Sequence, residues 1–193
     1  MLSLLVVKSL KISIYDDNKL KKILGTSFAC SSKNGKLYQR PISELRNYFA
    51  NKVNYNGVVK GESVTIKGIE GRQIDLDIKL SGDNFESFAI DFGVSDSTYT
   101  RFLYNKKQGT LEVDRTYSGL TSDLNCQRKM FVGSSDELEL HFVLDKFSIE
   151  LFVNDGEKTM TTEIQTPLAS NGIRFNSLGE AKVTIEKHDI VIA

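Results

Sequence analysis

The stretch from residue 138 to residue 164 constrains the fold most, because its apolar residues alternate with polar ones and change phase on the way. Apolar side chains hold even positions up to Leu144 and odd positions from Phe147. Successive side chains of a strand point to opposite faces, so a two-residue turn at Asp145-Lys146 returns both strands to one buried face. The opposed pairs that this turn predicts are Leu144 with Phe147, Phe142 with Ile149, Leu140 with Leu151, and Leu138 with Val153.

A second turn is predicted at Asn154-Asp155-Gly156-Glu157, because Asp-Gly is the strongest short hairpin signal. Three antiparallel strands then share one buried face. The pairs across the second hairpin are Met160 with Leu151, Thr162 with Ile149, and Ile164 with Phe147. The other face carries Glu139, His141, Ser148 and Glu150, with His141 directly across from Glu150 as a surface ion pair.

From Asn54 onward, turn signals recur about every eight to twelve residues between β-rich runs, which is the pattern of an all-β sandwich. Residues 74–80 alternate apolar residues with Asp75, Asp77 and Lys79, which predicts a strand whose outer face is wet. Phe88, Ile90 and Phe92 mark the core side of the next strand. Further predicted strands are a hairpin formed by 101–104 and 110–113, and a closing strand at Val183 and Ile185. The fold class predicted is therefore a two-sheet antiparallel β-sandwich, a lectin-like jelly roll.

The part before the sandwich is predicted to hold one short helix. Between Pro41 and Lys52, residues Leu45, Tyr48 and Phe49 fall at i, i+3 and i+4, and Pro41 suits the start of a helix. Further upstream, alternation predicts a strand over 10–14 and another over 23–30, followed by a loop at 31–35.

Three segments resemble glycoside hydrolase family 32, the family of invertases, levanases and sucrose-6-phosphate hydrolases. Residues 145–157 are similar to the signature of its C-terminal β-sandwich module, and the resemblance implies structural roles for five of them. These are Asp145, Glu150, Asn154, Asp155 and Gly156. Residues 109–119 resemble a segment one or two strands earlier, and residues 35–45 the linker that leaves the catalytic propeller. Phe147 and Thr116 depart from the family pattern, which usually has a small hydroxyl residue and Ser there.

The resemblance covers roughly residues 36–193 and implies a division of the chain. Residues 1–36 would be an N-terminal extension or the remnant of a preceding propeller blade. Residues 37–53 would be a linker with a short helix, and residues 54–193 the β-sandwich module.

Catalytic residues are not expected. The family's nucleophile lies in a Trp-Met-Asn-Asp-Pro-like motif, its transition-state stabiliser in Arg-Asp-Pro and its acid in Glu-Cys. The chain has no Trp, its prolines follow Arg40 and Thr166, and its cysteines follow Ala29 and Asn125. One interpretation of Asp114 and Glu150 is an acid/base pair of carboxylates. The preferred interpretation is that Asp114 pairs with Arg115 or caps a turn, and that Glu150 lies on a solvated strand face.

Sugar binding remains an alternative, because sandwiches of this architecture also serve as lectins. The candidate contacts are Tyr99, Tyr104 and Tyr117, with Arg101 and Asp114 as polar neighbours. Against this, tyrosines at alternating strand positions more often lie half-buried at the rim of a core.

Charge and composition exclude several other classes. Basic and acidic residues number 25 each, so the chain lacks the basic surface of a nucleic-acid binder. No run approaches the roughly 20 apolar residues that span a bilayer. The two cysteines and two histidines have no metal-ligand spacing, so neither a metal nor a cofactor is expected. The apolar N-terminus lacks a basic region before it and a cleavage site after it, which favours a cytoplasmic protein, or a secreted one if the parent is of the levanase type.

The function expected from these observations is that of a non-catalytic sandwich module of a β-fructofuranosidase-like enzyme, as a separate fragment or the product of a truncated gene. It would act in domain packing, stability and oligomerisation, with a catalytic propeller domain or a second copy as its partner. An apolar patch is then expected over residues 37–49. The alternative is a separate carbohydrate-binding module for fructans or sucrose derivatives. An intact small hydrolase, the third possibility, has no motif to support it.

Overall fold

The computed structural model describes residues 28–33, 36–119 and 126–191, and strands make up most of them. The strands are β1 (Phe28–Lys33), β2 (Lys36–Pro41), β3 (Phe49–Val64), β4 (Ile74–Ser81), β5 (Phe85–Val94), β6 (Thr100–Asn105), β7 (Thr110–Asp114), β8 (Gln127–Phe131), β9 (Glu137–Asp145), β10 (Ser148–Val153), β11 (Lys158–Glu163) and β12 (Gly172–Ile190). The one helical element in these ranges is a 3-10 helix, η1 (Ser43–Tyr48). Within them, no helix is long and apolar enough to span a membrane.

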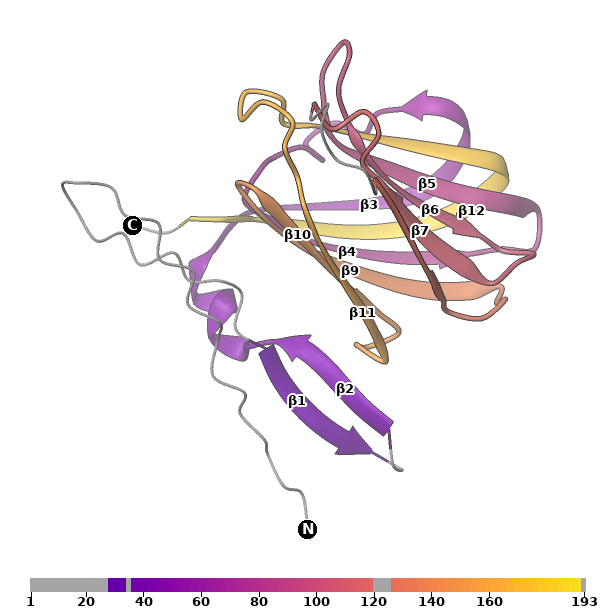
Figure 1. Ribbon diagram of the computed structural model, residues 1–193, viewed down its shortest axis with the longest axis horizontal. Coiled ribbons are helices and arrows are strands. Elements are labelled where there is room, and N and C mark those ends of the chain that lie inside the picture. The colour runs from indigo at the N-terminus through magenta and orange to yellow at the C-terminus, as the bar shows by residue number, and fades with distance from the viewer. Residues whose placement is uncertain (1–27, 34–35, 120–125, 192–193) are drawn as a thin grey trace, which may run out of the picture.

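Ten strands form one antiparallel sheet that curls into two layers (Figure 1). The strand order is β11-β10-β9-β4-β12-β5-β6-β7-β8, with β3 also paired to β12. The first half of β12 pairs with β5 and the second half with β4. The register of β12 shifts at Leu178/Gly179, where Gly179 has a φ of +98° that suits glycine at a bend. The long strand β12 therefore carries the chain from one layer to the other, and the predicted all-β sandwich is confirmed.

The space between the layers is filled by the inward residues of alternating strands, as the sequence pattern requires. Phe142 of β9 lies 5.0 Å from Phe92 of β5 and 5.2 Å from Phe102 of β6, measured between ring centroids. Phe92 and Phe102 meet edge to face at 5.8 Å, an arrangement that aromatic pairs prefer. These three rings join the two layers at the centre of the core.

The hairpin of β9 and β10 has the predicted buried face but a different register. Leu144 is opposite Ile149 and Phe142 is opposite Leu151, so the predicted pairing is wrong by two residues. The turn consists of Lys146 and Phe147, and the amide of Lys146 donates to the Asp145 Oδ1 at 2.7 Å. A shift of two residues leaves every side chain on the same face, except that Phe147 now lies in the turn with 57% of its surface exposed.

The second hairpin is confirmed, since Leu151 is opposite Met160 and Ile149 is opposite Thr162. The new register of the first hairpin also moves His141. It lies opposite Phe152, whereas Glu150 lies opposite Val143. The predicted ion pair between His141 and Glu150 is therefore wrong, and Glu150 is largely buried.

The predicted helix is shorter than expected, because the chain is already extended at Phe49, where β3 begins. Leu45 and Phe49 instead pack on a small cluster on the outer face of the sheet, formed by Val143, Phe152 and Ile190. This short 3-10 helix is enough to place these two side chains, and 3-10 turns are common as connectors.

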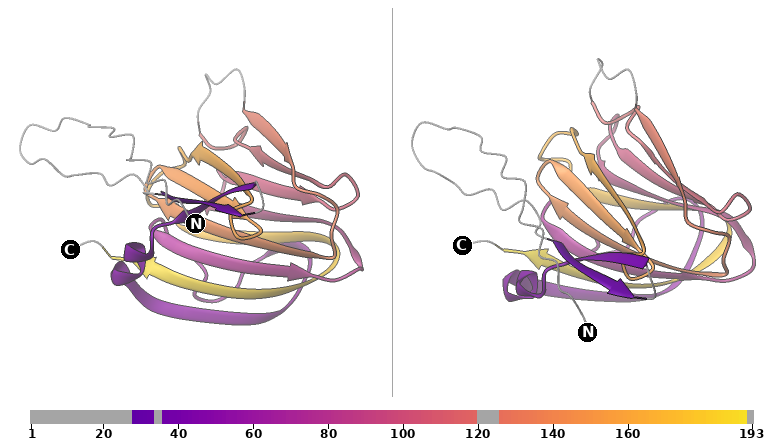
Figure 2. Two further views of the ribbon diagram at one scale, coloured as in Figure 1. Left: turned by 90° about the horizontal axis from the view of Figure 1, so that it is seen from below. Right: turned by 60° about the horizontal axis from the view of Figure 1, so that its bottom comes forward.

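Strands β1 and β2 form a hairpin outside the sandwich, and together with η1 they are called the arm below (Figure 2). The Gln39 amide donates to the Gly156 carbonyl at 3.0 Å, and Arg40 pairs with Asp155. A Cβ at Gly156, whose φ is +85°, would collide with the Gln39 carbonyl. Glycine is therefore required where the turn between β10 and β11 meets the arm.

The strands and the loop predicted before residue 36 can be compared with the structure only in part. Strand β1 continues to Lys33, so the loop predicted to begin at Ser31 is wrong. The strand predicted over 10–14, and most of that over 23–30, lie outside the described residues.

Candidate functional site

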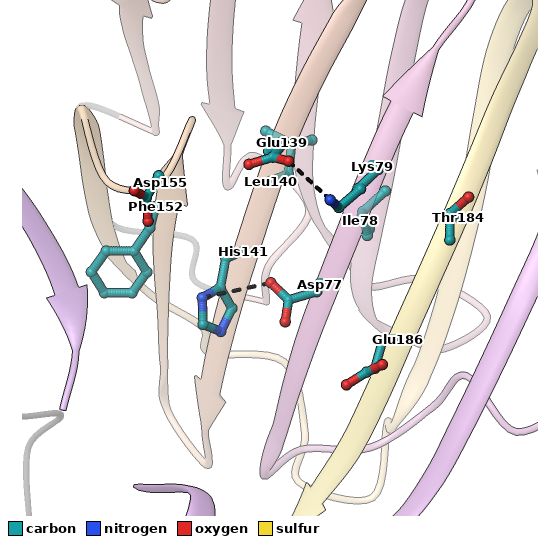
Figure 3. Close-up of a pocket in the computed structure, with 10 residues that line it drawn as sticks. All are labelled: Asp77, Ile78, Lys79, Glu139, Leu140, His141, Phe152, Asp155, Thr184 and Glu186. Carbon is teal, nitrogen blue, oxygen red and sulfur yellow. Dashed lines mark ion pairs between the residues drawn. The ribbon is translucent and has the colours of Figure 1, made fainter. Parts of the chain in front are cut away.

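A polar groove separates the arm from the outer face of β4, β9 and β12. Two adjoining cavities of about 360 Å³ and about 640 Å³ make it up. Both are lined by Asp77, His141, Phe152, Asp155 and Glu186, and Figure 3 shows these side chains. The arm lines the larger cavity from Arg40 to Phe49.

The strand order brings the polar side chains of the groove together. Asp75 and Asp77 alternate with buried residues of β4, so both point to the outer face. Asp77 is the Cα partner of His141 on β9 and of Glu186 on β12, and Asp75 is the partner of His188. Two imidazoles and three carboxylates from non-consecutive strands therefore share one small area.

His141 lies between the two carboxylates of β4. Its Nε2 is 2.8 Å from the Asp75 Oδ2, and its Nδ1 is 3.7 Å from the Asp77 Oδ1. The first distance is that of a hydrogen bond and the second is too long for one. Asp75 is only 3% exposed, so the prediction of a wet outer face is wrong at this residue, which lines the cavity between the sheet and the arm.

Burial and charge shift the pKa values in the groove. Burial lowers the pKa of His141, but the hydrogen bond to Asp75 and the charges of Asp75 and Asp77 outweigh it and raise the pKa above its ordinary value. Burial raises the pKa of Asp77, against the attraction of His141. The hydrogen bond from Lys52 lowers the pKa of Glu186. The groove therefore holds an imidazole that favours its protonated form.

We expect the free energy of unfolding to fall as pH rises from 6 to 8.5. A raised pKa in the folded state means that the folded chain binds the His141 proton more tightly than the unfolded chain, so this stabilisation is complete below ~6.5 and is lost as pH rises through the folded pKa. The raised pKa of Asp77 likewise makes the free energy of unfolding fall as pH rises, but over a lower pH range. Urea unfolding at several pH values in metal-free buffer measures the slope. The His141→Gln variant should have a flatter profile, and an unchanged slope would contradict the assignment.

Three further side chains, from η1, β3 and β12, surround the carboxylates of the groove. Lys52 Nζ lies 2.7 Å from the Glu186 Oε2, and the ring of His188 stacks on that of Phe49 at 4.6 Å. Arg46 of η1 lines the larger cavity and acts on the pKa of Asp77 and of His141 through its charge. Such a set of groups can bind a cation. One of its carboxylates has a raised pKa and another a lowered one, as carboxylates at acid/base catalytic sites often do.

Most of the tyrosine site predicted from sequence lies elsewhere, on the outer face of the β5–β8 layer. The rings of Tyr99 and Tyr117 stack at 5.2 Å, and the guanidinium of Arg101 lies 5.1 Å from the Tyr99 centroid. Asp114 is the Cα partner of Arg101. Tyr104 does not belong to this group, because it is 1% exposed and its hydroxyl donates to the Gly133 carbonyl at 3.1 Å.

The residues that hold this tyrosine cluster in place were not predicted from the sequence. Asp91 is 0% exposed, and its carboxylate accepts hydrogen bonds from Arg101, Arg174 and Asn176. Arg174 also lies over Tyr99, at 5.2 Å from the ring centroid. The signal in the sequence was an acidic residue in a strand that is otherwise strongly apolar, between Ile90 and Phe92.

Asn154 and Asp155 of the family signature lie in a turn, and Asp114 of the earlier segment caps one, whereas Glu150 lies within β10. Asp114 accepts hydrogen bonds from the Thr116 amide and from Gln127, at 2.8 and 2.9 Å, so the turn-capping interpretation of Asp114 is confirmed. Asn154 accepts a hydrogen bond from the Glu139 amide at 3.1 Å. Asn154 and Asp155 both have positive φ, a conformation that Asn and Asp tolerate better than most residues.

The chain matches known proteins over most of its length. The family model described as the C terminal of glycosyl hydrolases family 32 matches residues 42–191. A sucrose-6-phosphate hydrolase of Staphylococcus xylosus is 27% identical over 160 residues, which are 82% of this chain and 32% of that protein. A raffinose invertase of Escherichia coli is 25% identical over 133 residues, 68% of this chain and 27% of its own length. The chain thus spans about a third of the length of these relatives.

Solved structures share the fold. The exo-inulinase of Aspergillus awamori superposes with a TM-score of 0.73 at 21% identity, covering 86% of this chain and 35% of that one. The sucrose-6-phosphate hydrolase of Lactobacillus gasseri gives a TM-score of 0.69 at 22% identity, covering 85% and 33%. Because the family model covers far more than half of the sequence, the chain belongs to glycosyl hydrolase family 32, of which it represents the C-terminal domain.

Proposed function

We propose that this chain is a non-catalytic β-sandwich module that packs against and stabilises the catalytic domain of a β-fructofuranosidase-like enzyme. The observation that carries the proposal is the match of residues 42–191 to the C-terminal part of the family, at about a third of the relatives' length. The family's catalytic motifs have no counterpart in the sequence, which contains no Trp. The substrates of the whole enzyme would be sucrose, its 6-phosphate or fructans.

Apolar residues exposed near the arm support a packing role. Leu37 of β2 and Tyr48 of η1 are exposed, and so is Val191, whose amide donates to the Tyr48 carbonyl at 2.9 Å. Leu45 and Phe49, in contrast, pack on the chain's own sheet. The surface offered to a partner is therefore narrower than the whole linker, and a second copy of the chain is an alternative occupant to a catalytic domain.

The proposal predicts that the purified chain has no hydrolytic activity. Sucrose, sucrose 6-phosphate and raffinose would be incubated with the chain, with an intact family 32 enzyme as the positive control, and released hexose measured. The physical reason is the lack of the family's nucleophile and acid motifs. Turnover that is lost in the Asp77→Asn and Glu186→Gln variants would contradict the proposal and assign catalysis to the groove.

Sedimentation on the same samples tests self-association, which Tyr48→Ser should weaken if the Tyr48 surface is the interface.

Carbohydrate binding is the second candidate, and the tyrosine stack favours it. Tyr117 is 54% exposed and is supported from below by Tyr99, as in a platform for a sugar ring. Calorimetric titration with sucrose, fructose and a short inulin or levan oligomer should then show binding that Tyr117→Ala abolishes. Phe131→Ala, which removes another exposed ring of the same layer, is the matched control. Absence of binding to the unmodified chain would reject this candidate.

A further inference from the structure

We propose that the groove binds a divalent transition-metal ion such as Zn²⁺, with His141 Nδ1 and the Asp77 carboxylate as ligands and Asp75 as the residue that positions the imidazole. Ligand atoms of these three residues lie within 4.8 Å of one another. The inference rests on the groove alone and not on the proposed packing role.

The distances around His141 fit this arrangement. Its Nε2 and the Asp75 Oδ2 are 2.8 Å apart, as expected if Nε2–H donates to the carboxylate, so Nδ1 is the nitrogen that an ion can bind once it displaces the Nδ1 proton. Metal-binding histidines commonly have their second nitrogen held by a carboxylate in this way, which fixes the tautomer and the ring orientation. Asp75 is almost fully buried, so its carboxylate is well placed to hold the ring.

The other side of the ring has the spacing of two ligands on one ion. Nδ1 and the Asp77 Oδ1 are 3.7 Å apart, too far for a hydrogen bond. Zinc binds nitrogen and carboxylate oxygen at roughly 2.0–2.2 Å, so two such ligands 3.7 Å apart subtend an angle of about 125° at the ion, about 15° wider than the tetrahedral angle. An ion between these atoms therefore requires little movement of either side chain.

A further carboxylate and an open side are available. Figure 3 shows Asp77 between His141 and Glu186, and Glu186 is the Cα partner of Asp77 on β12. Water in the groove can complete the coordination. Asp75, Asp77 and Glu186 supply negative charge close to His141, and Lys52 and Arg46 lie near these carboxylates.

The ligand types select the class of ion. Imidazole nitrogen with carboxylate oxygen suits Zn²⁺, Mn²⁺ or Co²⁺, whereas Ca²⁺ and Mg²⁺ prefer oxygen ligands alone. A second, partly buried imidazole lies beside the site, since His188 is the Cα partner of Asp75. Its Nδ1 is buried and has no hydrogen-bond partner among the described residues.

The test is calorimetric titration of the purified chain with Zn²⁺, repeated with Co²⁺ while the visible spectrum is recorded. We expect one ion per chain and a cobalt spectrum without thiolate bands. Asp77→Asn, which alters a half-exposed side chain, should weaken binding by at least tenfold, and Asp75→Asn by about 10–100-fold. The matched control is Glu139→Gln, which removes the same charge from the same face two residues from His141, and its affinity should not change.

Three results would overturn the proposal. Equal weakening by Asp77→Asn and Glu139→Gln would show diffuse attraction to the negative face instead of ligation. Loss of binding in Cys126→Ser would assign the ion to the half-exposed thiol. No heat and no cobalt spectrum with millimolar metal would show that the groove does not bind such ions.

Discussion

Replacing Phe142 by alanine is expected to lower the free energy of unfolding by about 3–5 kcal/mol, the range for truncating a fully buried phenylalanine. Its side chain is 0% exposed and lies at 5.0 and 5.2 Å from the rings of Phe92 and Phe102, so it contacts both layers. The variant loses the buried area of the ring and leaves a cavity that strands paired on both sides cannot close. Urea unfolding followed by far-ultraviolet circular dichroism measures the change.

Phe147→Ala is the matched control, because the two registers of the hairpin predict opposite results for it. In the register predicted from sequence, Phe147 faces the core opposite Leu144. In the structure it lies in the turn with most of its surface exposed, so the substitution should change the free energy of unfolding by no more than about 0.5 kcal/mol. A large loss in Phe147→Ala, or a small one in Phe142→Ala, would contradict the observed register.

The sequence was sufficient to predict which face of each strand is buried. Alternation over 74–80 and 138–153 depends only on a period of two, and each apolar position of these stretches other than Phe147 and the outward-facing Val143 and Phe152 is in the main core. It was not sufficient for the register, because a shift by two residues conserves that alternation. In the observed register Lys146 and Phe147 form the turn, and the Asp145 carboxylate accepts a hydrogen bond from the Lys146 amide.

The groove could not be predicted for a different reason. Asp75 and Asp77 were recognised as outward-facing, but their neighbours His141 and Glu186 follow from the order β9-β4-β12, which joins strands far apart in the chain. The cysteines and histidines lack metal-ligand spacing along the chain, but such spacing does not show which side chains lie together across a sheet. The role of Asp91 beside the tyrosine cluster could not be predicted for the same reason, since Asp91 accepts a hydrogen bond from Arg174, 83 residues away in the sequence.

The second large effect is expected at Asp91, where Asp91→Asn should cost about 3–5 kcal/mol of unfolding free energy, as for breaking a buried ion pair. The carboxylate is 0% exposed and accepts from Arg101 Nε and Nη2 at 2.6 and 2.8 Å and from Arg174 Nε at 3.0 Å. Arginine side chains are not deprotonated in proteins, so both guanidinium groups stay charged when the carboxylate is replaced. Arg101 and Arg174, whose guanidinium groups lie 5.1 and 5.2 Å from the Tyr99 centroid, then lose the carboxylate that they share, and Asp114 is the acidic neighbour that Arg101 keeps.

The control for this prediction is Asp136→Asn, which removes the same charge from a surface pair. Lys106 Nζ lies 2.6 Å from the Asp136 Oδ1, whose side chain is 72% exposed, and such pairs contribute only about 0–1 kcal/mol. If the cost at Asp91 arises from uncompensated charge, removing one arginine in the double variant Asp91→Asn/Arg174→Gln should restore part of the lost stability, as a double-mutant cycle would measure. Strictly additive losses would show instead that Asp91 acts through packing, and that the tyrosine platform above it does not depend on the charge network.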